Sequence, residues 1–139
     1  MAGFIEDGYE REAYLAPDSP EAGVEKLHDG ITFTYRTAAR SEVIKHDAQV
    51  RHSLLNDDRD PSCSVTAEKM ACAFVAPKIT KWDLKDSKGE VVPITPENML
   101  RIIPALFSPM YRIVRGTRGS DKKPTETEES PSDEQLAKN

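Results

Sequence analysis

Alternation between apolar and polar positions marks the segments that we expect to form strands. The clearest case is residues 30–36, where Ile31, Phe33 and Tyr35 alternate with threonines. β-Branched and aromatic residues at a period of two are typical of a half-buried strand. A less regular form of the pattern predicts three more strands, near residues 9–15, 79–84 and 90–94. The last two segments flank a turn and form a predicted hairpin.

Spacings of three and four residues between apolar positions predict three helices, at about residues 38–55, 66–76 and 96–115. The third helix has the longest apolar stripe. Thr95 is placed to cap its start and Gly116 to close its end. Two prolines inside it must kink it or split it into two pieces. Its apolar positions are Met99, Ile103, Leu106, Phe107, Met110, Ile113 and Val114.

These elements predict an α+β fold with a short antiparallel sheet, in one domain that covers residues 1–116. After Gly116 the apolar content collapses. In residues 117–139 only Leu136 and Ala137 are apolar, and the other positions are mostly Ser, Thr, Pro, Glu and Lys. Such a segment buries too little apolar surface to offset the entropy lost on ordering. We therefore expect residues 117–139 to form a disordered polar tail.

Composition narrows the classes of function. The chain of 139 residues has a net charge of -5, which disfavours binding to a phosphate backbone. Its start has neither a basic segment nor an apolar run, and no stretch reaches the roughly 20 apolar residues of a membrane helix. Two cysteines without an export signal are expected to be reduced thiols. We expect a cytosolic protein that binds neither nucleic acid nor membrane.

The sequence also lacks patterns for a metal site or a catalytic site. His46 and His52 are six residues apart, which places them on roughly opposite faces of one helix, as solvated side chains. Cys63 and Cys72 do not form a C-x-x-C pair, and the aspartates at residues 57–60 lack the calcium-loop pattern. No nucleophile motif or phosphate loop is present. We expect no cofactor, no metal and no enzymatic activity; a small hydrolase or a zinc protein is the remaining enzymatic alternative.

Trp82, the only tryptophan, leaves two interpretations open. As a core residue it would anchor the predicted hairpin against the last helix, near Phe107. As an exposed residue it would be a hot spot for a protein partner. The core interpretation is favoured on general grounds, and Trp82 also stays among the candidate partner-binding residues.

One part of the chain resembles a known family. The pattern begins with KWDLKD at residues 81–86 and continues through Gly89 and the sequence VPIT at residues 92–95. It ends with a helix that carries Leu106 and Phe107 and closes with IVRG at residues 113–116. Residues 9–15 and 31–36 fit the same pattern upstream. This pattern resembles small proteins of tailed-phage tail operons, which are encoded near the tail tube and tape-measure genes. Such proteins are identified as tail assembly chaperones or chaperone-like proteins.

The resemblance implies a non-enzymatic protein that acts in the host cytoplasm during virion morphogenesis. It would bind and solubilise the tape-measure protein, and the tail tube protein is a second candidate partner. We expect the partner to bind a face formed by Met99, Ile103 and Met110, with Phe107 beneath it. The alternative is a structural virion component, such as a head–tail joining or tail completion protein. The sequence does not fix the oligomeric state, and self-association stays open.

Overall fold

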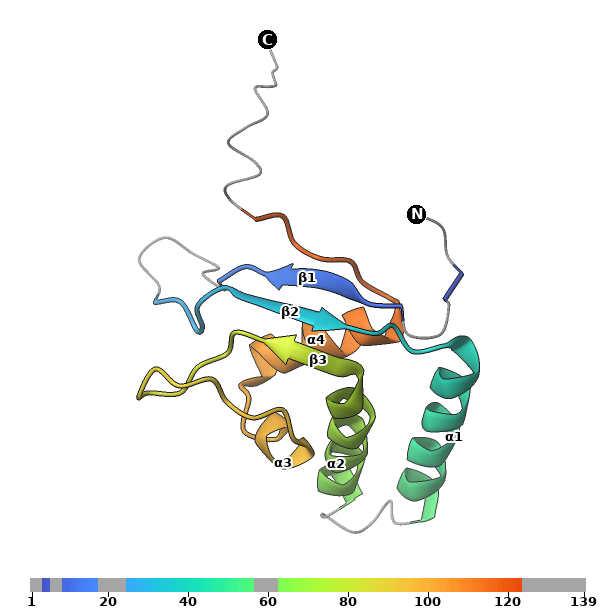
Figure 1. The fold of residues 1–139 in the computed structure, drawn as a ribbon. Helices are drawn as coiled ribbons and strands as arrows, with labels where there is room; N and C mark the ends of the chain where they lie inside the picture. The colour runs from blue at the N-terminus through green and yellow to red at the C-terminus, as the bar shows by residue number, and fades with distance from the viewer. Residues whose placement is uncertain (1–3, 6–8, 18–24, 57–62, 124–139) are drawn as a thin grey trace.

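The fold is built on a three-stranded antiparallel sheet with its helices on one side (Figure 1). The strands are β1 (Arg11–Leu15), β2 (Ile31–Tyr35) and β3 (Ile79–Trp82), in the order β1-β2-β3. This computed structural model describes residues 4–5, 9–17, 25–56 and 63–123. The predicted α+β class is confirmed, and three of the four predicted strands are present with ends that differ by two residues or fewer.

The register of the sheet explains which side chains form the core. Ala13 on β1 lies opposite Phe33 on β2, and Phe33 lies opposite Trp82 on β3. These three residues are buried on the face that the helices cover. Strand residues alternate between the two faces of a sheet, so the threonines of β2 lie on the other, more exposed face. The alternation that predicted β2 therefore marks the boundary between core and solvent.

Helices α1 (Arg40–Asn56) and α2 (Cys63–Val75) form a pair that extends away from the sheet (Figure 1). A short 3-10 helix, η1 (Ala76–Lys78), leads from α2 into β3. Helix α4 (Pro104–Arg115) lies against the sheet and contributes Leu106, Met110, Ile113 and Val114 to the core. Helix α2 packs against both α1 and α3 (Pro96–Met99).

The predicted helix 96–115 is two helices. Helix α3 (Pro96–Met99) is a single turn, and Thr95 Oγ1 caps it by accepting the Asn98 backbone N–H at 3.1 Å. Helix α4 begins afresh at Pro104, whose fixed φ and missing N–H suit the first turn of a helix. Gly116 ends α4 with a φ of 84°, a conformation that glycine adopts without strain.

The predicted strand at residues 90–94 is wrong. Within the described chain this segment forms one isolated bridge, between Lys85 and Val91. The Asp86 carboxylate accepts the backbone N–H groups of Lys88 and Glu90, at 2.9 and 3.0 Å, and closes a turn in which Gly89 has a φ of 83°. Pro93 has no N–H to donate, so the ladder does not continue.

Contacts with the domain do not stop at Gly116, where the sequence places its end. Residues 117–123 run along β1 (Figure 1). Ser120 Oγ accepts the Tyr14 N–H at 2.8 Å, and the Asp121 N–H donates to the Tyr14 carbonyl at 2.9 Å. Lys123 forms an ion pair with Glu12. The predicted tail therefore begins as an ordered strap on β1, and residues 124–139 lie outside the described part of the chain.

None of the helices described is both long enough and apolar enough to cross a membrane.

Candidate partner-binding site

Three of the four candidate partner-binding residues lie in the core. Met99 is 1% exposed, Met110 is 0% exposed and Trp82 is 4% exposed, whereas Ile103 is 39% exposed. A buried side chain presents no surface to a partner. The expectation that Met99, Ile103 and Met110 form one exposed face is therefore wrong, and only Ile103 remains available.

The break between α3 and α4 explains this error. In one continuous helix, Met99, Ile103 and Met110 would share a face because they are four and seven residues apart. Ile103 is instead the extended residue that precedes α4, with a φ of -62° and a ψ of 147°. Its side chain is therefore out of phase with Met110, and the core-facing positions of α4 start at Leu106.

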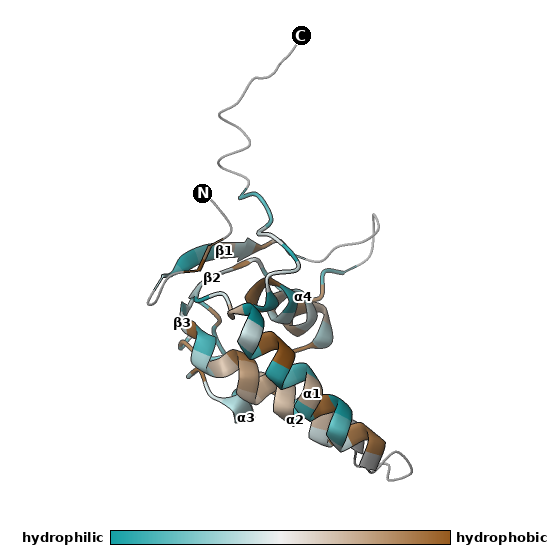
Figure 2. Cartoon of the chain, turned by 90° about the vertical axis from the view of Figure 1, so that its right-hand side faces the viewer, coloured by the Kyte–Doolittle hydropathy of each residue, from teal (hydrophilic) through white to brown (hydrophobic). Residues whose placement is uncertain are grey.

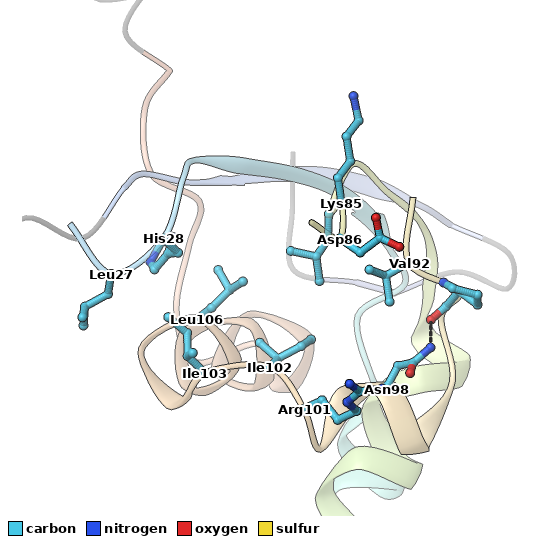
Figure 3. A pocket seen from close by; sticks show the side chains of 12 residues that line it. Leu27, His28, Lys85, Asp86, Val92, Asn98, Arg101, Ile102, Ile103 and Leu106 are labelled. Carbon is cyan, nitrogen blue, oxygen red and sulfur yellow. Dashed lines mark hydrogen bonds between the residues drawn. The ribbon is translucent and has the colours of Figure 1, made fainter. Parts of the chain in front are cut away.

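Ile103 lies in the wall of a cleft of about 570 Å³. One wall comes from the end of the α3–α4 turn and the start of α4, and the other from the hairpin segment at residues 84–93 (Figure 3). Leu27, which is exposed, lies at one end. The apolar residues that line the cleft are Leu27, Leu84, Val92, Pro93, Ile102, Ile103 and Leu106.

Hydrogen bonds hold the hairpin wall in place. The buried Trp82 indole N–H donates to the Val92 carbonyl at 2.6 Å. The Asn98 amide on α3 donates to the Pro93 carbonyl at 2.9 Å, drawn as a dashed line in Figure 3. The wall is thus tied both to the sheet and to α3. A cleft with fixed walls loses little entropy when a ligand enters it.

One cationic side chain, that of Arg101, lies at the edge of the cleft without an acidic partner among the described residues. Asp86 already accepts two backbone N–H groups within its own turn. Lys85 points away from the space, and Arg101 lies at its edge beside Asn98 (Figure 3). Arg101 forms no ion pair within the described part of the chain. The arrangement is an apolar cleft with one cationic edge, and His28 and Asp86 also line it.

Sequence patterns did not reveal this cleft. Leu27 lies outside every predicted element, and Val92 falls in a predicted strand that does not form. The one available sign was a concentration of apolar residues in segments that contain prolines. Neither helical nor strand periodicity detects a surface that is assembled from loops.

A second cluster that the sequence did not reveal links three helices. His46 on α1 is buried, contrary to the expectation of a solvated histidine, and its ring stacks on Phe74 of α2 at 4.2 Å between centroids. Its Nε2 lies 2.9 Å from the Tyr111 hydroxyl on α4. Arg115 lies over the Tyr111 ring and binds both carboxylate oxygens of Asp47, at 2.7 and 3.0 Å. This ion pair holds the pKa of Asp47 below its ordinary value.

Groups of metal-binding side chains are absent from the described residues: no three His, Cys, Asp or Glu lie together there. The aspartates at residues 57–60 are outside that part of the chain. Cys72 is buried in the core, and burial raises the pKa of its thiol, which disfavours the reactive thiolate.

Comparison with known proteins gave no match to a family model, to a curated protein or to a solved structure.

Proposed function

We propose that this protein is a non-enzymatic, chaperone-like protein of a phage tail operon, which binds the tape-measure protein through the cleft beside Ile103. The observation that supports this proposal is the apolar lining of a cleft whose walls are already fixed. Amphipathic helices bind such clefts through apolar side chains spaced three or four residues apart. A tape-measure protein is long, helical and apolar, and needs cover until the tail tube forms around it.

The same stretch of sequence carries the resemblance and the cleft. Trp82, Leu84 and the VPIT segment belong to the motif that resembles tail assembly chaperones. Trp82 holds the hairpin wall through its hydrogen bond to Val92, and the VPIT segment forms part of that wall. On this proposal the motif maintains the shape of the binding site, and Trp82 acts from the core instead of touching the partner. The site of action would be the host cytoplasm, and the tail tube protein would be a second partner.

The test is co-expression with a tape-measure protein encoded beside this gene. We expect the wild-type chain to raise the soluble fraction of the tape-measure protein and to co-purify with it. Ile103→Glu combined with Leu27→Glu places two charges at the cleft and should abolish both effects. Val65→Glu combined with Leu54→Glu is a matched control, because these two side chains are similarly exposed on α2 and α1 and neither lines the cleft.

Two outcomes would contradict the proposal. If the wild-type chain leaves the tape-measure protein insoluble, the chaperone function is wrong. If the cleft variant remains fully active, the partner binds elsewhere. Analysis of purified particles tests the alternative function, since a virion component would be present in stoichiometric amounts and a chaperone would be absent.

A further inference from the structure

The outward face of α1 combines apolar and cationic side chains and is covered by no other described element. Ile44 is 59% exposed and Leu55 is 70% exposed. Ala48 and Arg51 lie between them and are also exposed. These four positions are separated by four, three and four residues, so they form one stripe along the helix. In Figure 2, α1 faces the viewer and shows alternating hydrophobic and hydrophilic segments along its length.

The acidic side chains of α1 are turned to other partners. Glu42 pairs with Lys78 at 2.6 Å, and Asp47 is held by Arg115. Arg40 and Arg51 lie along the stripe and Lys45 lies beside it, and none of the three forms an ion pair within the described residues. The exposed face of α1 is therefore cationic, although the chain as a whole is acidic.

The negative charge of the chain is concentrated in its last segment. Residues 124–139 contain five acidic residues and one lysine, and so carry four of the five net negative charges. The same segment contains Leu136 and Ala137, its only apolar residues. Acidic side chains next to a short apolar pair complement the α1 face, where Ile44, Ala48 and Leu55 lie among cations.

The segment is long enough to reach α1. It follows Lys123, which forms an ion pair with Glu12 on β1. Glu12 lies opposite Thr34, close to the end of β2 from which the chain leads to α1. A five-residue strand spans about 17 Å, whereas 16 residues can extend to about 50 Å. A second copy of α1 is a poorer occupant than the segment, because antiparallel packing of two such faces brings cations of one copy toward cations of the other.

We propose that residues 124–139 bind the exposed α1 face of the same chain, with the acidic side chains at Arg40, Lys45 and Arg51 and with Leu136 on the apolar stripe. A tethered segment needs little intrinsic affinity, because its effective concentration at a site within reach is on the order of millimolar. This inference does not depend on the cleft or on the tape-measure protein.

The test places a nitroxide spin label in the segment of the full-length protein. Ser130→Cys carries the label, in a background with Cys63→Ser, and amide peak heights of the ¹⁵N-labelled chain are compared before and after reduction of the nitroxide. At an ionic strength of roughly 0.01 M, we expect the α1 amides near residues 44–55 to lose about half of their height or more. At about 1 M, where charges are screened within about 3 Å, the loss should disappear.

Charge reversal provides the matched comparison. Lys45→Glu with Arg51→Glu should restore the α1 peaks at low salt. Lys81→Glu with Lys88→Glu changes the net charge equally at exposed positions away from α1 and should leave the broadening intact. Broadening centred on the cleft, or none on α1, would overturn the proposal. Broadening that appears only between spin-labelled and ¹⁵N-labelled molecules in a mixed sample would overturn binding within one chain and assign the site to a second copy.

Discussion

The imidazole Nε2 of His46 on α1 lies 2.9 Å from the hydroxyl oxygen of Tyr111 on α4. Arg115 donates to the same hydroxyl oxygen at 3.4 Å, which leaves the hydroxyl proton free to point at His46. A neutral imidazole can accept that proton, whereas an imidazolium cannot. The contact therefore favours the neutral form of His46 in the folded protein.

We expect the protein to lose stability as the pH falls below about 6.5, the ordinary pKa of histidine in an unfolded chain. Burial lowers the pKa of His46; the charge of Arg115 lowers it further, and that of Asp47 opposes the change. The unfolded chain then binds the proton more tightly than the folded chain. The contribution is fully present above the unfolded pKa and declines as the pH falls toward the lower folded pKa.

Urea denaturation between pH 7.5 and pH 5 measures this effect, with roughly 1–3 kcal/mol per molar denaturant as the usual slope for a small protein. The His46→Gln variant should show a smaller loss over the same range, because the other titrating groups are unchanged. An identical loss in the variant and the wild type would assign the pH dependence to other residues.

Substitution of Trp82 should also lower the free energy of unfolding. It is buried between the sheet and the helices, and its N–H is bonded to Val92. Trp82→Ala should lower the free energy of unfolding by roughly 3–5 kcal/mol, as large aromatic deletions in cores do. Trp82→Phe keeps most of the volume but leaves the Val92 carbonyl without its donor, at a cost of about 1 kcal/mol more than the loss of area. Equal stability of Trp82→Phe and the wild type would show that the hydrogen bond contributes nothing.

Met110 and Ile103 provide a direct test of the corrected helix phase. Met110→Glu would bury a carboxylate in the core and should abolish cooperative unfolding, since unpaired buried charges cost more than about 4 kcal/mol. Ile103→Glu should change stability by about 1 kcal/mol or less, because this side chain already meets solvent. Circular dichroism during thermal melting separates the two, and Met110→Leu is the volume-matched control. Similar melting of both glutamate variants would show that the two residues are not in different environments.

The sequence predicted the strands and helices that have one face toward the core and the other toward water. Strand β2 and the stripe of α4 from Leu106 onward show this contrast, and both were found. The prolines predicted that the helix kinks or splits. The direction of the Met99 side chain relative to α4 could not be predicted, because an extended residue between two helices changes how their side chains are oriented relative to each other. The cleft and the His46 cluster depend on how loops and three helices meet, and local periodicity contains no information on such contacts.

The strap at residues 117–123 leads to the last prediction. The sequence placed these residues in a disordered tail, yet Ser120 and Asp121 bond to both backbone groups of Tyr14. The Asp121 carboxylate also accepts the Ala16 N–H at 3.0 Å. Strand β1 is at the edge of the sheet, so these bonds cover backbone groups that would otherwise be open to another chain.

Truncation after Gly116 should therefore cost about 1–2 kcal/mol, since two or three solvent-accessible hydrogen bonds contribute roughly 0.5–1 kcal/mol each. For a domain of this size, that loss lowers the melting temperature by several degrees, at roughly 3–6 °C per kcal/mol. Truncation after Lys123 is the matched control: it removes residues 124–139 and keeps the bonds of Ser120 and Asp121 to β1, so its melting temperature should stay close to that of the full chain. The shorter truncation should also self-associate more readily, because it uncovers the β1 edge, and light scattering during the melt would detect this. If both truncations melt at the same temperature and remain monomeric, the strap neither stabilises the domain nor protects the edge of its sheet.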